Sequence, residues 1–185
     1  MNAMKLTEKT ISQKMLVEGR IINLRQDTVM LENGKTALRD VVEHPGGVCV
    51  LPLTEDNEVI LVKQFRYPYQ EVLFEIPAGK LDKGEEDPLH CGMRELEEET
   101  GFQCGHIEKM LSLKTTVAFC NEFIDVYLAT DLKPGKQHLD PEEFIEVRAY
   151  EPEELLEKIY AGVIQDSKTV AGILAYCYRY RNNMK

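Results

Sequence analysis

The stretch that decides the fold is GKLDKGEEDPLHCGMRELEEETGF, residues 79–102. Its first part carries two glycines and two lysines around a turn at Gly84, which predicts a loop. Pro88 suits the first turn of a helix, good helix formers follow it, and Gly101 suits a C-terminal stop. The stretch therefore predicts a loop, then a helix, then a stop.

Two faces of this predicted helix differ in chemistry. At about 100° per residue, Glu95, Glu98 and Glu99 share one face, which we call the carboxylate face. A separate apolar stripe is expected to consist of Leu89, Met93, Leu96 and Thr100. Arg94 lies one turn before Glu98 and offsets part of the repulsion among the carboxylates. We interpret it as a residue that orients them in preference to the alternative of a direct catalyst.

The carboxylate face has the chemistry of a cation site. Like charges at this spacing repel one another, and hard carboxylate oxygens suit Mg²⁺ or Mn²⁺ rather than zinc. An acidic run on a helix is by itself typical of a solvated face. The full pattern consists of Gly79, Glu86, Arg94, Glu95, Glu98, Glu99 and Gly101. It should arise by chance on the order of once in 10⁸ windows, which favours the cation site.

The same arrangement resembles the Nudix box, in which a glycine and a spaced glutamate precede Arg-Glu-hydrophobic-x-Glu-Glu-x-Gly-hydrophobic. Residues 94–102 match this pattern at every fixed position. The distance from Gly79 to Arg94 is one residue longer than is usual in the family. Either Glu85 keeps the usual spacing to the glycine or Glu86 keeps the usual spacing to the arginine. We favour Glu86, with the extra residue in the loop.

The likeness extends to most of the chain, roughly residues 16–180. Segments that resemble the ADP-ribose pyrophosphatase branch of the family lie at residues 19–22, 39–48, 63–67, 75–80 and 143–147. The resemblance implies an α+β fold, an α/β/α sandwich around a mixed sheet with a small N-terminal antiparallel sheet. It also implies a homodimer, with an N-terminal β-sheet segment (residues 1–43) at the interface and a Nudix hydrolase domain at residues 44–185.

Local patterns place the individual elements. Strands are expected at residues 16–24, 28–31, 48–53, 58–65, 72–76, 107–113, 122–130 and 144–150, with loops at 32–35, 133–136 and 138–143. Pro152 is expected to open a helix that runs to about Tyr160. Asp166 and Ser167 are expected to cap a last helix. Its core stripe is expected to be Val170, Ile173, Leu174 and Cys177.

Composition narrows the class of partner. The net charge of −10 argues against a nucleic-acid partner and against an anionic membrane surface, because both require a basic patch. No apolar run approaches 18 residues and the first residues are polar, so we expect a cytoplasmic protein. The five cysteines show no metal-ligand spacing and are expected to be reduced packing residues.

The resemblance implies roles for particular residues. The metal ligands would be Glu95, Glu98 and Glu99 together with the backbone carbonyl of Ala78, and the cofactor would be Mg²⁺, with Mn²⁺ as a substitute. The general base would come from the loop before the last strand. Glu143 is the first candidate for that base and Glu142 is the alternative.

Other polar residues are candidates for substrate binding. Arg39 and Arg66 carry guanidinium groups that fit phosphate oxygens, although an ordinary surface salt bridge explains either of them nearly as well. Glu75 is expected in a strand, where it points either at the substrate pocket or at solvent. His44 precedes Pro-Gly-Gly and is expected to shape a turn.

The implied reaction is hydrolysis of ADP-ribose, a small nucleoside diphosphate derivative, to AMP and ribose 5-phosphate. The branch commonly carries Ser-Pro-Gly-Phe after the box, where residues 116–119 read Thr-Val-Ala-Phe. GDP-mannose or another nucleoside diphosphate sugar is therefore the alternative substrate. A non-catalytic nucleotide-sugar-binding protein and an acidic interaction module are alternatives of a different class.

Overall fold

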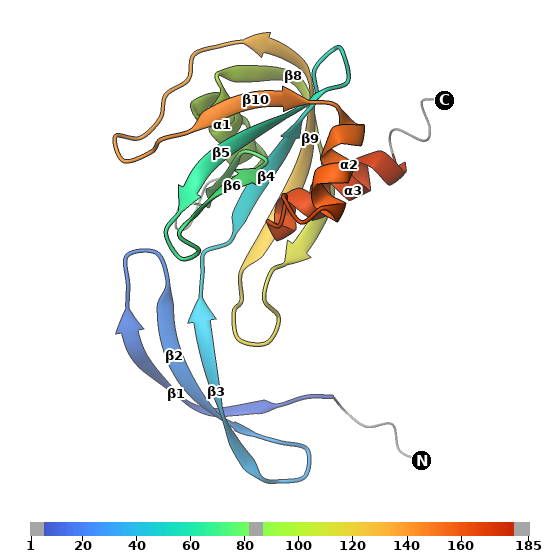
Figure 1. Cartoon of the computed structure of the whole chain (residues 1–185). Coiled ribbons are helices and arrows are strands. Elements are labelled where there is room, and N and C mark those ends of the chain that lie inside the picture. Colours follow the sequence, from blue (N-terminus) through green and yellow to red (C-terminus); the bar gives the residue numbers. More distant parts are fainter. Residues whose placement is uncertain (1–5, 82–86, 180–185) are drawn as a thin grey trace. The chain divides into compact units, whose positions relative to one another are not determined.

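The computed structural model describes residues 6–81 and 87–179 (Figure 1). The chain forms two compact units, the first made of residues 1–46 and 114–122 and the second of residues 47–113 and 123–185. The segment 114–122 thus belongs with the N-terminal sheet, although a division at residue 43 would place it in the other unit. Among the described residues, no helix is long and apolar enough to span a bilayer.

The first unit is built on a three-stranded antiparallel sheet in the order β1-β2-β3. Its strands are β1 (Lys9–Glu18), β2 (Asn23–Met30) and β3 (Thr36–Glu43). The expected single strand over residues 16–24 is wrong, because the chain turns there and the Gly19 N–H donates to the Ile22 carbonyl at 3.0 Å. The expected turn at 32–35 is confirmed, with Gly34 at φ +76°.

The second unit contains two sheets. One has the order β7-β4-β9-β8 and comprises β7 (Ala78–Lys80), β4 (Gly47–Pro52), β9 (Phe123–Pro134) and β8 (Phe102–Lys114). β4 runs parallel to β9, from Gly47 opposite Ile124 to Pro52 opposite Ala129, and antiparallel to β7. The other is antiparallel in the order β10-β5-β6, with β10 (Glu146–Tyr150), β5 (Val59–Arg66) and β6 (Glu71–Glu75).

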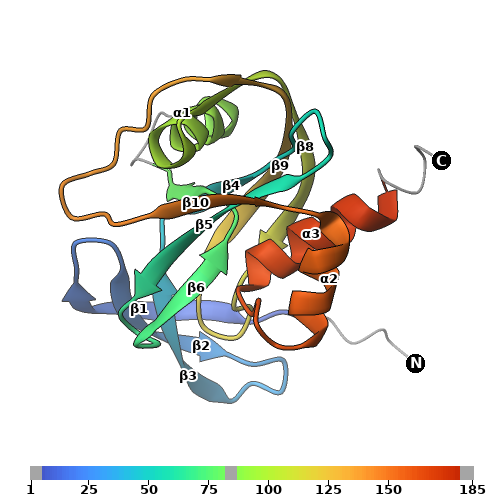
Figure 2. The ribbon, with the colours of Figure 1, turned by 45° about the horizontal axis from the view of Figure 1, so that its top comes forward.

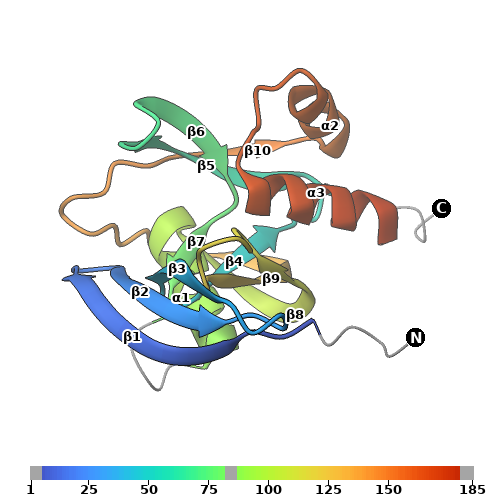
Figure 3. The same ribbon diagram turned by 90° about the horizontal axis from the view of Figure 1, so that it is seen from below.

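Side chains of β4 alternate between two apolar cores on opposite faces of the mixed sheet, as the two-residue period of a strand requires. Val48 and Val50 pack in the core that includes Leu96 of helix α1 (Pro88–Thr100). Cys49 and Leu51 pack in the core that includes Ile173 of helix α3 (Ser167–Arg179). Figures 2 and 3 show α1 on one side of β4 and β9 and α3 on the other, with α2 (Pro152–Tyr160) beside α3. The expected α/β/α arrangement is confirmed.

Two predicted apolar stripes are partly wrong. On α1, Met93 is 39% exposed, while Cys91 and Glu99 are buried. On α3, Leu174 is 37% exposed, and the buried side includes Thr169 and Tyr176. In each helix a small residue sets the buried face, because Gly92 and Gly172 let the helix approach side chains of β4 and β9 closely.

Strand lengths also differ from the expectation. β8 begins directly after the helix stop at Gly101, and β9 continues to Pro134, into the first two residues of the loop expected at 133–136. Both extensions carry polar or exposed residues, which conceal a strand from a hydrophobicity pattern. β4, β5, β6, α2 and the start of α3 lie within about two residues of their expected bounds, and β10 starts at Glu146.

Candidate active site

Helix α1 is fixed at both ends by its own sequence. The Asp87 carboxylate accepts hydrogen bonds from the N–H groups of Leu89 and His90, at 2.8 and 3.4 Å. Gly101 has φ +74° and its N–H donates to the Glu97 carbonyl at 2.8 Å, which ends the helix in a left-handed cap. The side chains of the carboxylate face therefore project from a helix with defined limits.

Glu99 is the buried member of the carboxylate face, with 4% of its surface exposed. Its Oε2 accepts a hydrogen bond from the Ala78 N–H at 3.1 Å. Burial, together with the neighbouring carboxylates of Glu95 and Glu143, raises the pKa of Glu99 to about 8, although the hydrogen bond from the Ala78 N–H acts to lower it. A buried carboxylate with these neighbours is a position that a cation would stabilise strongly.

Glu95 lies against the backbone of β7. A Cβ atom at Gly79 would overlap the Glu95 carboxylate, so the first glycine of the motif is required for this close approach. Burial also raises the pKa of Glu95, partly offset by Arg94. Arg94 Nη1 lies 2.9 Å from Glu95 Oε1 and 2.7 Å from Glu98 Oε2, which supports its interpretation as the residue that orients the two carboxylates.

The donor set fits a hard divalent cation. Glu95, Glu98 and Glu99 offer oxygen ligands. The pKa values of Glu95 and Glu99 are raised mainly by burial and further by neighbouring carboxylates, and a bound cation would offset both effects. Within residues 6–81 and 87–179, no three His, Cys, Asp or Glu side chains are already gathered in metal-ligand geometry. Arg94 holds two of the carboxylates instead. The predicted ligand set therefore stays a prediction, and Glu85 and Glu86 lie outside the described residues.

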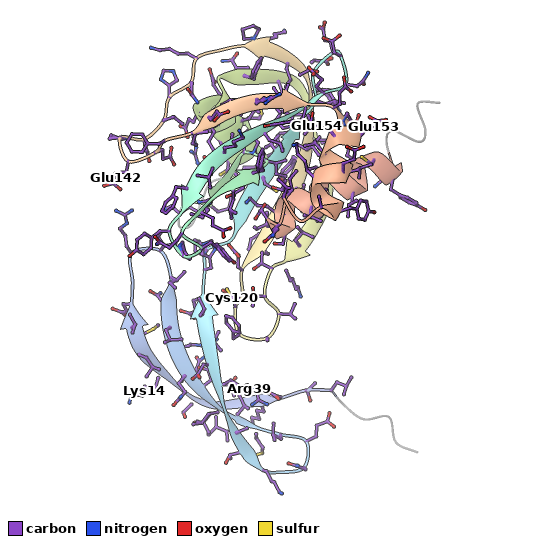
Figure 4. All side chains as sticks on the ribbon, in the orientation of Figure 1. Lys14, Arg39, Cys120, Glu142, Glu153 and Glu154 are labelled. Carbon is purple, nitrogen blue, oxygen red and sulfur yellow. The ribbon has the colours of Figure 1, made fainter. Side chains whose placement is uncertain are left out.

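Glu143 lies on the loop between β9 and β10. Its backbone N–H donates to the Asp140 carbonyl at 2.9 Å, and its Oε2 accepts from the Asp140 N–H at 3.1 Å, which forms a closed turn. The carboxylate is near enough to raise the pKa of both Glu95 and Glu99. Glu142 is exposed on the same loop (Figure 4). The structure thus places Glu143 in the electrostatic neighbourhood of the carboxylate face.

Arg66 and Glu75 form one unit. Arg66 Nε and Nη2 donate to Glu75 Oε1 and Oε2 at 2.6 and 2.7 Å. Glu75 is 2% exposed and also accepts from Lys168 Nζ at 2.5 Å, so the alternative that it points at solvent is wrong. Arg66 is partly exposed and interacts electrostatically with Glu99. A direct contact of either residue with substrate stays a prediction.

The remaining candidates lie in the first unit. Arg39 lies on β3 (Figure 4). It forms a surface ion pair with Glu8, with Nη2 2.5 Å from Glu8 Oε1. His44 Nδ1 accepts from the Gly46 N–H at 3.1 Å, as expected of a residue that shapes a turn. The role of Arg39 in substrate binding stays a prediction.

Sequence reasoning missed Lys168 and assigned Asp166 only the role of a helix cap. Lys168 is 7% exposed and its Nζ lies 3.0 Å from Asp166 Oδ2. A lysine in the first turn of a surface helix is ordinarily solvated, so its residue type gave no sign of burial. The one available signal was the sequence context, because the apolar residues Ile164 and Val170 flank this lysine at the start of the helix.

The raised pKa of Glu99 predicts how stability depends on pH in metal-free protein. Folding raises the pKa of this carboxyl group from 4.5 to about 8. Its contribution to stability is complete when the pH is below the pKa of the unfolded chain, and it is lost as the pH rises through about 8. The free energy of unfolding should therefore fall between pH 5 and pH 8, by on the order of a few kcal/mol. Glu99→Gln should flatten this slope. Urea denaturation in EDTA at four pH values measures it, and equal slopes in both proteins would contradict the assignment.

Comparison with known proteins agrees with this geometry. The NUDIX domain model matches residues 43–171, and a nucleoside diphosphate sugar hydrolase N-terminal domain model matches residues 8–42. A methanol dehydrogenase activator of Bacillus methanolicus is 42% identical over 168 residues, which cover 90% of both chains. An ADP-ribose pyrophosphatase of Bacillus subtilis (strain 168) is 41% identical over 170 residues, which cover 91% of both chains.

One solved structure extends the comparison of folds. The crystal structure of an ADP compounds hydrolase matches with a TM-score of 0.84 over 95% of both chains, at 15% identity, which bears on the fold alone. The sequence comparisons show more, because the domain model covers most of the chain and the two relatives cover nearly all of it. The resemblance noted from residues 79–102 is thus confirmed, and the chain belongs to the Nudix family.

Proposed function

We propose that this protein hydrolyses the pyrophosphate bond of ADP-ribose, giving AMP and ribose 5-phosphate, with Mg²⁺ as cofactor and Mn²⁺ as a substitute. The observation that carries the proposal is the buried Glu99 carboxylate, which meets the Ala78 N–H and lies among like charges of Glu95 and Glu143. The 41% identity to an ADP-ribose pyrophosphatase supports the choice of substrate. The five free cysteines suit a cytoplasmic location.

Each residue has a distinct part in this reaction. Glu95, Glu98, Glu99 and the Ala78 carbonyl would hold the cation, which supplies neutralisation of phosphate charge when bound. Arg94 orients Glu95 and Glu98. Glu143 would accept a proton from water as the water oxygen bonds to one phosphorus and the bridging P–O bond breaks. A positively charged Arg66 would bind the diphosphate, because a guanidinium fork matches phosphate oxygens.

GDP-mannose or another nucleoside diphosphate sugar is the second candidate substrate. Residues 116–119 read Thr-Val-Ala-Phe in place of the Ser-Pro-Gly-Phe common in the ADP-ribose branch, and they lack its proline and glycine. The complete set of carboxylates on α1 argues against a non-catalytic sugar-nucleotide sensor, since a protein that only binds would not require all of them.

The identity to a methanol dehydrogenase activator supports one further candidate, action on a dehydrogenase. This candidate is compatible with a pyrophosphatase, because the similarity extends over the same 90% of the chain that contains the carboxylate face. Adding the protein to purified methanol dehydrogenase and measuring alcohol oxidation tests it. An unchanged rate, with and without Mg²⁺, would remove this candidate.

The substrate proposal is tested by identifying products. The protein is incubated with ADP-ribose, GDP-mannose or UDP-glucose, with Mg²⁺ or with EDTA, and the nucleoside monophosphates are separated by chromatography. We expect AMP from ADP-ribose at the highest rate and no product in EDTA. GMP as the main product would show that GDP-mannose is the preferred substrate. Absence of a nucleoside monophosphate from all three substrates would overturn the proposed activity.

We also propose that the protein is a homodimer in which a second copy covers the N-terminal sheet. Every residue of β1 is exposed, and four apolar side chains of β1 are among the exposed large hydrophobic residues: Ile11, Met15, Leu16 and Val17. A three-stranded sheet that leaves such side chains in water gains stability when a partner covers them.

A charged substitution on β1 tests the dimer. The protein should sediment with about twice the 21.2 kDa mass of one chain. Val17→Glu should shift the equilibrium to monomer by roughly tenfold or more, because the interface would bury a charge. Lys14→Glu is the matched control, since this position on the same strand is already charged (Figure 4). A monomeric native protein at micromolar concentration would contradict the proposal.

A further inference from the structure

Four charged side chains form a neutral group next to the active site, and the reaction described above uses only Arg66 among them. This group, which we call the charge cluster, consists of Arg66, Glu75, Asp166 and Lys168. Two members are almost fully buried, with exposed fractions of 2% for Glu75 and 7% for Lys168. A buried ion pair is costly to form, so its presence calls for a reason beyond packing.

Glu75 is the centre of the charge cluster. It accepts two hydrogen bonds from the Arg66 guanidinium, at 2.6 and 2.7 Å, and one from Lys168 Nζ at 2.5 Å. The paired contact from Nε and Nη2 fixes the plane of the guanidinium, because both planar groups must align. Glu75 does not engage Nη1, which carries two further N–H donors.

Asp166 connects the charge cluster to the protein backbone. Its Oδ2 accepts from Lys168 Nζ at 3.0 Å, from the Thr169 N–H at 3.0 Å and from the Thr169 hydroxyl at 2.6 Å. The Thr169 hydroxyl oxygen accepts from the Ile76 N–H at 2.9 Å. The start of α3 is thus tied to the end of β6, two residues before the Ala78 N–H that meets Glu99.

The charges within the cluster balance only when Lys168 is present. Burial lowers the pKa of Lys168, but the carboxylates of Glu75 and Asp166 raise it overall, so the ammonium group stays charged. Without this cation, the cluster would contain two carboxylates and one guanidinium. Arg66, which already interacts electrostatically with Asp166 as well as with Glu75, would then be shared between two negative charges, and Glu75 alone would no longer fix its position.

We propose that Lys168 is a positioning residue, which supplies the counter-charge that lets Glu75 hold Arg66 with its Nη1 edge directed at the diphosphate of the substrate. This inference rests on the proposed function and adds to it a residue that acts only through Arg66. A purely structural role, in which the charge cluster fastens α3 to β6, would predict a loss of stability and no specific effect on diphosphate binding.

A double-mutant cycle separates the two roles. Binding of α,β-methylene-ADP with Mg²⁺ is measured by calorimetry, and KM and kcat for ADP-ribose are measured in parallel. The proteins are the wild type, Lys168→Met, Arg66→Ala and the double variant. Lys168→Met should raise Kd and KM by about tenfold, the size of one charge-assisted hydrogen bond, with a smaller change in kcat. In the Arg66→Ala background the same change should alter Kd by less than about twofold.

Two further variants serve as controls. Lys168→Arg keeps the cation and should retain most of the affinity. Lys109→Met removes a lysine whose Nζ lies 2.8 Å from the buried Asp125 carboxylate, outside the charge cluster, and it should leave Kd and KM unchanged. Where Lys168→Met does not fold, Glu75→Gln takes its place in the cycle, because it removes one charge at nearly constant volume.

The outcomes are distinct. Wild-type affinity in Lys168→Met, or an equal loss in the wild-type and Arg66→Ala backgrounds, would overturn the inference. Wild-type protein that binds α,β-methylene-ADP but does not cleave ADP-ribose would remove the proposed function and leave the inference standing. Wild-type protein that does not bind this diphosphate at all would remove the inference as well.

Discussion

Replacing Glu99 with glutamine is expected to lower kcat/KM for ADP-ribose about a thousandfold, which corresponds to ~4 kcal/mol of transition-state stabilisation. Glu99 is the buried member of the carboxylate face, and glutamine keeps its volume while it removes the negative charge that attracts a cation. The Ala78 N–H can still donate to the amide oxygen, so the local backbone should be preserved. The loss therefore reports on charge and not on packing.

The effect is measured by steady-state kinetics and by thermal unfolding with and without Mg²⁺. Mg²⁺ should raise the Tm of the wild type and leave that of Glu99→Gln unchanged, because a ligand stabilises only the protein that binds it. Glu97→Gln is the matched control, since Glu97 lies on the same helix and accepts instead from Gln103 Nε2 at 2.7 Å. Turnover of Glu99→Gln at the wild-type rate in excess Mg²⁺ would contradict the role assigned to this residue.

Replacing Glu143 with glutamine is expected to lower kcat by about a hundredfold to a thousandfold and to leave Mg²⁺ affinity nearly unchanged. Glu143 belongs to a different element from the carboxylate face, but its charge reaches both Glu95 and Glu99. A glutamine at this position cannot accept the proton of the attacking water. The expected signature is thus a loss of kcat while Mg²⁺ still raises the Tm. Loss of the cation site, as in Glu99→Gln, would instead remove both turnover and the stabilisation by Mg²⁺.

Glu142→Gln is the control for this experiment, because Glu142 is the neighbouring carboxylate on the same loop (Figure 4). It should retain kcat within a few-fold of the wild type. A large loss in Glu142→Gln alone would transfer the role of base to Glu142. A small effect in both variants would show that the base does not lie on this loop.

Local patterns were sufficient to predict the buried strands of the second unit, whereas the α/β/α order of the layers came from the family resemblance. β4 and the first four residues of β5 form continuous buried runs, and such runs are typical of strands covered on both faces. The limits of α1 were also predictable, since Pro88 and Gly101 act through local backbone preferences that do not depend on the rest of the protein.

Other features depend on tertiary contacts that no local pattern contains. Residues 9–15 of β1 were missed because all residues of this strand are exposed, so its side chains do not alternate between core and solvent. The buried face of α1 was rotated from the expected one because Gly92 packs against Val50 and Tyr127, residues distant in sequence.

In the candidate site, too, local spacing predicted some features and others depend on tertiary contacts. The spacing of Glu95, Glu98 and Glu99 predicted one helical face. In the structure all three lie on α1, and Arg94 contacts the first two. The burial of Glu99, the contact of Glu95 with Gly79 and the burial of Lys168 arise only where strands β6 and β7 meet helices α1 and α3. Residue type alone would place each of these charged groups at the surface.

The most direct test is a crystal structure of the protein soaked with Mg²⁺ and α,β-methylene-ADP-ribose. We expect at least one Mg²⁺ between the diphosphate and carboxylate oxygens of Glu95, Glu98 and Glu99, at about 2.0 to 2.1 Å from each ligating oxygen. Carboxylates that remain on Arg94 or turn toward bulk water, with the diphosphate bound and no ion between, would contradict the proposed chemistry.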